Sequence, residues 1–359
     1  MLFFGAQMAD KIRIKDIAVR AGVSVGTVDR VLHKRPNVSK EAYEKVENVL
    51  KEINYQPNMY ASALAYNKNY EFFVVLPQHD SEAYWEEVEE GIEKACSMRR
   101  DFHISVRMVY YELFDPKSYS ETLDEVMASN PQGVIIVPTD LESTRQYTDV
   151  LHERGIPFIM LDSYIPDLRP LSFYGQDSFR SGAFAARMLM LIVKGDTEIM
   201  LMKQTKNGMV ASRQQMNREI GFRLYMKETY PAVKILDVEL PLEKSDYDDI
   251  LEDFFKSHPG VRQCITMCSR AYIVGEFLSR TNRRNVQIMG YDMVGRNAAC
   301  LRNGSISFLI AQHAFVQGYQ CVDSMFRAVV LKQEVAPVNY MPIELLTKEN
   351  VDFYRKAQM

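Results

Sequence analysis

The sequence predicts an α/β protein: a small all-α helical headpiece followed by two Rossmann-like lobes, each built on a parallel sheet. Residues 11–57 place apolar side chains at helical spacing, whereas from residue 70 onward short apolar strands alternate with amphipathic helices. Helices of a dozen or so residues between buried strands are typical of right-handed βαβ crossovers. The remaining stretch of about 290 residues exceeds the roughly 150 residues of an ordinary single domain, so we expect two lobes.

Three helices are expected in the headpiece. The first covers 15–21 and is stopped by Gly22, the second starts from an N-cap at Ser24, and the third is capped by Ser39 and ends before Pro57. A serine hydroxyl accepts a hydrogen bond from a free N–H of the first helical turn, and glycine readily takes the left-handed conformation that closes a helix.

Ten strands are expected in the remainder of the chain. They are 72–77, 104–110, 133–138, 157–162, 171–176, 198–202, 233–239, 263–268, 286–292 and 306–311. Each is a short apolar run, and helices separate nearly all of them.

Composition excludes several classes of protein. The content of 47% hydrophobic and 25% charged residues is that of a folded protein, and no run approaches the roughly 18 apolar residues of a membrane span. The five cysteines are an odd number and scattered, which predicts reduced thiols and a cytoplasmic location. Residues 10–55 hold ten Lys/Arg and seven Asp/Glu within a chain of net charge -4, so the N-terminal end is the basic one.

The strongest local motif runs from Ile12 to Ser39, IRIKDIAVRAGVSVGTVDRVLHKRPNVS. Two short helices joined by a tight turn at Gly22 have the geometry of a helix-turn-helix, whose second helix enters the major groove of DNA. Ala18 and Val28 are small or apolar where the two helices cross. A generic helical hairpin is the alternative interpretation.

This segment resembles the DNA-binding headpiece of the LacI/GalR family of bacterial transcription regulators. The family's run stands here as Asp16-Ile17-Ala18, Ala21-Gly22-Val23-Ser24, Thr27-Val28 and Arg30-Val31-Leu32, and VSKEAYEKVENVLKEINYQPN, residues 38–58, is similar to its third helix. The resemblance implies a dimeric repressor that binds double-stranded operator DNA. It also implies that the α/β remainder is periplasmic binding protein-like and binds a small sugar or sugar derivative.

The resemblance assigns the DNA contacts to Lys15, Ser24, Val25, Gly26, Thr27, Asp29, Arg30, Asn37 and Leu64. Asp29 replaces the family's serine, and Val25 and Gly26 offer no side-chain hydrogen bond. Base readout is therefore expected to depend on Arg30, on Asp29 and on contacts with thymine methyl groups. Leu64, within the run Ala61–Ala65, stands where the family has a hinge helix that wedges an apolar side chain into the minor groove.

The expected domains follow from this resemblance and from the change of pattern along the chain. They are an N-terminal extension at 1–10, the headpiece at 11–57, a hinge and linker at 58–69, and an effector domain at 70–359. Its lobes are expected at about 70–190 plus 309–338, and at 191–308 plus 339–359.

Effector ligands should gather at the carboxyl ends of strands, where open α/β sheets form their crevice. Asp162 ends a predicted strand, and the resemblance implies further effector ligands at Tyr84, Trp85, Asp177, Arg218, Ser269, Asp292 and Gln312. Aromatic rings stack on a sugar, and carboxylates and arginine hydrogen-bond to its hydroxyls. The alternatives are that the two aromatic residues only cover the core and that each aspartate caps a helix.

One departure from the family bears on the effector. Cys268-Ser269-Arg270 replaces the family's Asn-Asp at a strand end, which removes an amide and adds a cation. This substitution is compatible with an acidic or phosphorylated effector; the alternative is that Arg270 lies at a solvated helix start.

Catalytic motifs are missing from the sequence. There is no phosphate-binding loop, no zinc-protease helix, no nucleophile elbow and no dinucleotide fingerprint, so we expect no enzyme, no cofactor and no metal. The rival hypothesis is a sugar-binding or sugar-modifying α/β protein whose N-terminal helices mediate protein contacts. Salt-dependent binding to duplex DNA distinguishes the two.

Overall fold

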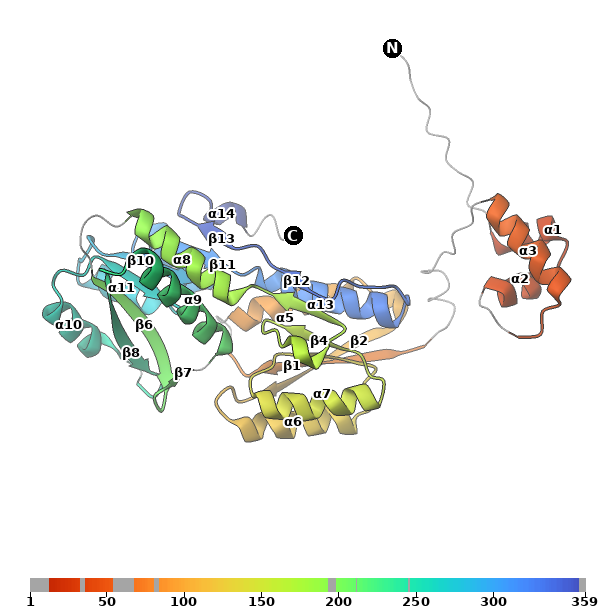
Figure 1. The fold of residues 1–359 in the computed structure, drawn as a ribbon, viewed down its shortest axis with the longest axis horizontal. Helices are drawn as coiled ribbons and strands as arrows, with labels where there is room; N and C mark the ends of the chain where they lie inside the picture. Colours follow the sequence, from red (N-terminus) through yellow and green to blue (C-terminus); the bar gives the residue numbers. More distant parts are fainter. Residues whose placement is uncertain are drawn as a thin grey trace, which may run out of the picture. The chain divides into compact units, whose positions relative to one another are not determined.

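The chain forms two compact units, Met1–Tyr66 and Asn67–Met359, in a computed structural model (Figure 1). The structure describes residues 13–32, 36–53, 68–80, 84–192, 198–210, 212–244 and 246–354. The expected N-terminal extension, and Leu64 with most of the expected hinge, lie outside these residues.

The first unit contains the three helices that the sequence predicts, α1 (Ile14–Ala21), α2 (Val25–Leu32) and α3 (Lys40–Glu52). Gly22 ends α1 in the left-handed region at φ 64°. The Ser24 hydroxyl accepts a hydrogen bond from the Thr27 N–H at 3.1 Å, and the Ser39 hydroxyl accepts one from Ala42 at 3.3 Å. Both serines therefore cap a helix as expected.

A small apolar core holds the three headpiece helices together. Its buried members are Ile17, Ala18, Ala21, Val28, Val31, Val46 and Val49. Alanines at the crossing of α1 and α2 allow these helices to lie close together, which leaves the opposite side of α2 facing solvent.

Lobe 1 of the second unit is a six-stranded, fully parallel sheet in the order β12-β5-β4-β3-β1-β2. The strands are β1 (Tyr70–Pro77), β2 (Ile104–Tyr111), β3 (Gly133–Ile136), β4 (Phe158–Leu161), β5 (Ser172–Gly175) and β12 (Asn339–Tyr340). Helices α6 (Pro116–Ala128) and α7 (Leu141–Glu153) cover one face, and α5 (Tyr84–Ser97) and α13 (Ala314–Val329) cover the other (Figure 1). Short 3-10 turns occupy Arg100–Phe102 and Pro166–Leu168.

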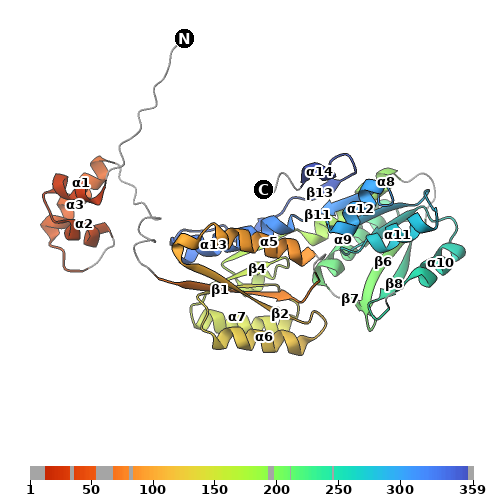
Figure 2. The ribbon, with the colours of Figure 1, turned by 180° about the vertical axis from the view of Figure 1, so that it is seen from behind.

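Lobe 2 has a seven-stranded sheet in the order β13-β11-β10-β9-β6-β7, with β8 also paired to β6. The strands are β6 (Glu198–Lys206), β7 (Met209–Val210), β8 (Lys234–Pro241), β9 (Gln263–Thr266), β10 (Gln287–Tyr291), β11 (Phe308–Ala311) and β13 (Glu344–Leu346). Helices α8 (Ser178–Ile192) and α9 (Arg213–Thr229) cover one face. The view from behind shows α10 (Asp248–Ser257), α11 (Tyr272–Arg280) and α12 (Gly295–Asn303) on the other (Figure 2), and α14 (Val351–Tyr354) closes the described chain.

The two lobes repeat one strand order. Across the lobe 1 sheet five strands lie in the order β2-β1-β3-β4-β5. Five strands of the lobe 2 sheet repeat this order as β8-β6-β9-β10-β11. The strand order reverses between β1 and β3 in one lobe and between β6 and β9 in the other. Open parallel sheets form their ligand crevice at the carboxyl ends of the strands beside such a switch point.

Each lobe also contains a helix pair that crosses at two glycines. A Cβ on Gly91 of α5 would overlap the backbone carbonyl of Phe315, and one on Gly182 of α8 would overlap that of Arg218. Gly318 and Gly221 make the reciprocal approaches from α13 and α9. Only a residue without a side chain allows backbones to come this close.

All ten predicted strands overlap observed ones, and the sequence missed only β7, β12 and β13 among the described residues, each two or three residues long. The lobe boundaries differ from those expected. Helix α8 packs on α9 in lobe 2, β11 pairs with β10 in lobe 2, and β12 pairs with β5 in lobe 1. The chain therefore crosses between lobes near 176–178, 311–314 and 340–344. The first crossing precedes α8 because the apolar partners of this helix lie in lobe 2.

In the part of the chain that the structure describes, no helix is both long and apolar enough to cross a bilayer.

Candidate functional site

The outward face of α2 is the candidate DNA-reading surface. Val25 is 49% exposed, and Gly26 and Arg30 are also exposed, whereas Asp29 is half-buried. The hydroxyls of Ser24 and Thr27 lie 2.9 Å apart, where they close the start of the helix. The arginine is therefore the long cationic side chain that this face offers to DNA.

Two further predicted DNA contacts flank this face along the sequence. Lys15 is exposed on α1, and Asn37 is exposed in the segment before α3, where its φ of 68° is left-handed. Neither side chain belongs to the headpiece core.

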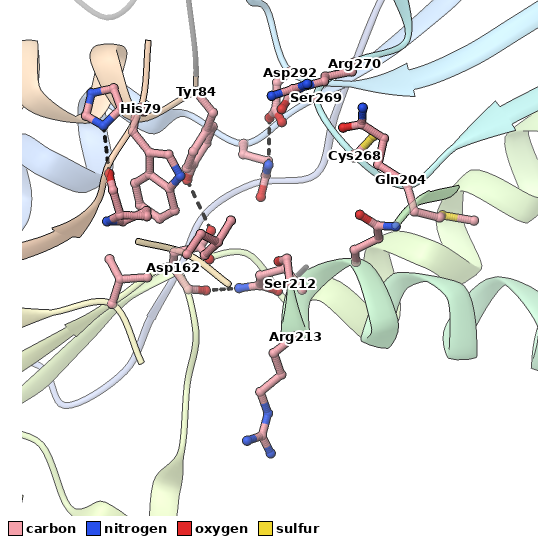
Figure 3. A pocket seen from close by; sticks show the side chains of 18 of the residues that line it. His79, Tyr84, Asp162, Gln204, Ser212, Arg213, Cys268, Ser269, Arg270 and Asp292 are labelled. Atoms are coloured by element: carbon pink, nitrogen blue, oxygen red, sulfur yellow. Dashed lines mark hydrogen bonds between the residues drawn. The ribbon is translucent and has the colours of Figure 1, made fainter. Parts of the chain in front are cut away.

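A cavity of about 610 Å³ lies between the two lobes (Figure 3). Residues from the carboxyl ends of β1, β3 and β4 line it from lobe 1, and residues from the ends of β6, β9, β10 and β11 line it from lobe 2. The start of α9 contributes five lining residues, 212–215 and Arg218. The cavity thus lies where the strand order of both sheets predicts a crevice.

Two aspartates occupy equivalent positions in this cavity. Asp162 follows β4 and Asp292 follows β10, two strands that hold the same place in the strand order that the lobes share. Both have left-handed backbones, at φ 66° and 70°, and both are about 95% buried. The N–H of each donates to a carbonyl near the end of the neighbouring strand, β5 or β11: Tyr174 at 2.8 Å and Ile310 at 3.0 Å. The same backbone turn therefore presents one carboxylate from each lobe.

Arg218 organises the lobe 2 side of the cavity. One guanidinium nitrogen donates to the carbonyl of Met267 at 2.9 Å and another donates to the side-chain oxygen of Gln312. Gln312 in turn donates to the carboxylate of Asp292 at 2.7 Å. The guanidinium carbon lies 4.1 Å from the ring centroid of Tyr291. These contacts fix the arginine in a single orientation.

On the lobe 1 side, Asp162 has both side-chain and backbone partners. The hydroxyl of Tyr84 donates to its carboxylate at 3.4 Å. The side-chain amide of Gln214, at the start of α9 in lobe 2, donates to its backbone carbonyl. This second hydrogen bond joins the two lobes directly across the cavity.

The three crossovers are also joined, by Gln176. Its side-chain amide donates to the carbonyls of Ala311 at 3.0 Å and Pro342 at 2.8 Å, and its side-chain oxygen accepts from Ser181 at 2.8 Å. A single buried side chain therefore connects the three segments by which the chain passes from one lobe to the other.

Burial controls the charge of the two carboxylates. Loss of solvation raises the pKa of Asp162 and of Asp292 to about 6, although the nearby Arg218 acts in the opposite direction. Burial likewise raises the pKa of Tyr84 well above its usual value, so its hydroxyl stays a donor. Among the described residues, no group of three His, Cys, Asp or Glu side chains could hold a metal ion.

Several buried polar atoms around the cavity have no hydrogen-bond partner among the described residues. They include the side-chain nitrogen of Gln215, the side-chain oxygen of Gln214 and Nε of Arg218, on residues that are at least 95% buried. Unpaired buried polar groups are costly, and a polar ligand that supplied partners would recover this energy.

Seven of the eight predicted effector residues line this cavity: Tyr84, Trp85, Asp162, Arg218, Ser269, Asp292 and Gln312. The rings of Tyr84 and Trp85 meet edge to face, with centroids 5.0 Å apart. Asp177 does not line it. Its carboxylate accepts from the N–H of Arg180 at 2.9 Å at the start of α8, and it borders a separate cavity of about 150 Å³.

The sequence did not predict Gln214, Gln215 or His79 as lining residues. His79 lies two residues after the end of β1, so the strand-end argument could have found it. The two glutamines belong to the start of α9 and could have been found from their position one turn before Arg218, since neighbouring turns of a helix share a face.

Comparisons with known proteins agree with this architecture. The family described as "Periplasmic binding protein domain" matches residues 72–333, and that described as "Bacterial regulatory proteins, lacI family" matches residues 13–58. The two modules thus define a class of protein, a DNA-binding headpiece joined to a two-lobed binding module.

Individual relatives narrow the assignment. A putative LacI transcriptional regulator from Bacteroides fragilis is 43% identical, with a TM-score of 0.78, over 80% of this chain and 100% of that structure. The sucrose operon repressor of Pediococcus pentosaceus is 25% identical over 79% of this chain and 82% of its own length. A glucose-galactose binding protein from Geobacillus stearothermophilus shares the fold, at 20% identity and a TM-score of 0.67 over 79% of this chain and 99% of that one. The chain belongs to the LacI family of bacterial transcription regulators.

Proposed function

We propose that this protein is a sugar-responsive repressor: the headpiece binds an operator, and a small sugar or sugar derivative in the interlobe cavity changes its operator affinity. The main evidence for this proposal is the set of residues that line the cavity. The cavity presents one carboxylate from each lobe, a fixed arginine and two aromatic rings, which together suit the hydroxyls and the apolar face of a sugar.

The structure of the headpiece supports the proposed binding of operator DNA. Its three helices are held by their own core, and the exposed face of α2 carries Arg30, whose guanidinium can bind guanine through two hydrogen bonds. One recognition helix reads only a few base pairs, and helix-turn-helix proteins extend the site by pairing two headpieces. A homodimer is therefore part of the proposal.

Substitutions in the headpiece test DNA binding. Operators are first selected from random duplexes, and binding of selected and random DNA is then measured at several salt concentrations. We expect Arg30→Ala to remove the discrimination between them, at about 1–3 kcal/mol. Lys15→Ala should weaken both kinds of duplex alike and flatten the salt dependence, because phosphate contacts position but do not specify.

The outcomes separate this proposal from a sugar-binding protein with a helical protein-interaction module. A chain that binds no duplex with salt-dependent affinity would support the second function. Equal losses for selected and random DNA in Arg30→Ala would show only that Arg30 does not read a base.

Emission of Trp85 tests the cavity. It is the only tryptophan in the chain and it lines the cavity. A sugar stacked beside it should change its emission saturably, without a label. An effector identified through operator release that leaves this emission unchanged would contradict the stacking role.

A further inference from the structure

The two walls of the cavity differ in charge. Among the described lining residues, lobe 1 contributes two aspartates and neither lysine nor arginine, whereas lobe 2 contributes four arginines and one aspartate. Arg296 is neutralised by both carboxylate oxygens of Glu276, at 2.9 and 2.5 Å. Arg213 points away from the other labelled side chains (Figure 3). The cations that remain for a ligand are Arg218 and Arg270.

These two arginines belong to one place in lobe 2, the switch point between β6 and β9. Arg218 donates to the carbonyl of Met267 at 2.9 Å and so ties α9 to the loop 267–270 that follows β9. Arg270 and Ser269 belong to this loop and line the same cavity. Arg270 is exposed, and no described carboxylate lies within ion-pair distance of it.

Unused hydrogen-bond donors are concentrated at the same switch point. The side-chain nitrogen of Gln215 and Nε of Arg218 are buried and have no partner among the described residues, and both residues line the cavity. Ser212, the N-cap of the 17-residue α9, makes no side-chain capping hydrogen bond. The positive end of a helix dipole, two unpaired donors and an unpaired arginine all favour an anion.

The corresponding switch point of lobe 1 is different. Pro77, Pro138 and Trp85 line it, together with Asp80. This wall offers apolar and aromatic surface and carries neither lysine nor arginine among its described residues. A ligand that met both walls would have a sugar ring on one side and a negative group on the other.

We propose that the effector carries an anionic substituent, a carboxylate or a phosphate, bound at the lobe 2 switch point by Arg270, Gln215 and the start of α9. This inference rests on the proposed function and names the chemical class of its effector. The neutral part of the sugar then lies between Asp162, Asp292 and the aromatic rings.

Matched sets of ligands test the proposal with the full chain. The probes are D-glucose with D-glucuronate and D-glucose 6-phosphate, D-galactose with D-galacturonate and D-galactose 6-phosphate, and inorganic phosphate alone. Binding is read from Trp85 emission and from the melting temperature at constant ionic strength. The carboxylate and phosphate members of each set distinguish the two kinds of anion.

We expect an anionic member to bind at least about tenfold more tightly than its neutral parent, or inorganic phosphate to saturate a site below about 10 mM. Arg270→Gln should abolish that preference or that site. Arg284→Gln removes an exposed arginine of lobe 2 that does not line the cavity, and it should behave as the unaltered protein.

The proposal is overturned if neutral sugars bind as tightly as their anionic partners, if the preference survives Arg270→Gln, or if neither the sugars nor phosphate bind saturably. Operator binding by the same three proteins is measured in parallel without ligand. Operator binding that is intact in all three while the anion site is absent would overturn this inference alone, whereas absence of specific operator binding would contradict the proposed function.

Discussion

The two lobes share their architecture and differ in the chemistry of the wall that each presents to the cavity. Both have the same strand order, an aspartate in a left-handed turn after β4 or after β10, and a helix pair that crosses at two glycines. Yet one wall is aromatic and acidic, and the other is rich in arginine and amide groups. The framework therefore determines where a ligand binds, and the strand-end residues determine which ligand.

The largest expected effect tests the shared architecture. Gly182→Ala should destabilise lobe 2 by about 3 kcal/mol, because the added methyl overlaps the backbone of Arg218 and this overlap outweighs the ~1 kcal/mol gain in helix propensity. Thermal and denaturant unfolding measure the change. Gly260→Ala is the control, since a Cβ there meets no atom within 4 Å. Equal stability of the two variants would show that the helix pair can separate without cost.

The next effect tests the equivalence of the two aspartates. Asp292→Asn and Asp162→Asn should each weaken sugar binding by about 2 kcal/mol, because each loses a charged acceptor for hydroxyl groups. Titration of Trp85 emission or calorimetry measures this loss. Asp249→Asn, on the exposed side of α10, should bind as the unaltered protein does. If one variant lost much of its sugar affinity and the other lost none, the two aspartates would not be equivalent ligands.

A third prediction concerns pH. Because both carboxyl groups have a pKa of about 6 in the folded chain against 3.8 ordinarily, the fold takes up protons more readily than the unfolded chain. Their contribution to the free energy of unfolding is therefore fully present below about pH 4 and is lost as the pH rises through 6. Sugar binding needs the ionised acceptors, so affinity should fall below pH 6 by up to tenfold per pH unit for each proton taken up.

Calorimetric titrations between pH 5 and 8 check this dependence. The double variant with asparagine at both positions should show a flatter profile. Sugar affinity that stays constant down to pH 5 in the unaltered protein would contradict the assignment of these carboxylates as sugar ligands.

The smallest expected effect concerns Asp177. Its carboxylate caps α8, so Asp177→Ala should cost about 1 kcal/mol of stability. Sugar affinity should not change, because the residue does not line the cavity. Asp177 and Asp292 both follow strands and look alike in the sequence. Comparing Asp177→Ala with Asp292→Asn therefore distinguishes an aspartate that caps a helix from one that binds the ligand. A loss of sugar affinity comparable to that of Asp292→Asn would place Asp177 among the ligands after all.

The difference between Asp162 and Asp177 shows how far the sequence predicts the site. Both follow a buried strand, so periodicity alone treats them alike. Strand β5 lies further from the switch point than β4, and its end leads directly into α8, whose free N–H groups attract the carboxylate. This distinction depends on the order of strands in the sheet, which is a property of long-range pairing.

The headpiece was predictable for the opposite reason. Its helix limits follow from Gly22, Ser24 and Ser39, and each of these acts on its immediate neighbours. In the α/β unit the strands were predictable from local apolar runs. The lobe to which α8 belongs was not, because its partners Phe222 and Met226 lie more than thirty residues further along the chain.

The proposed function requires that a ligand in the interlobe cavity control binding of DNA by the headpiece. The most direct test measures operator affinity of the full chain with and without a sugar that saturates Trp85 emission, and then sugar affinity with and without operator. Thermodynamic linkage requires both affinities to change by the same factor. We predict that sugar changes operator affinity and that operator changes sugar affinity, both by one factor clearly different from one. In Asp292→Asn the same sugar concentration should leave operator affinity unchanged. Saturable binding in the cavity that leaves operator affinity unchanged would contradict the claim.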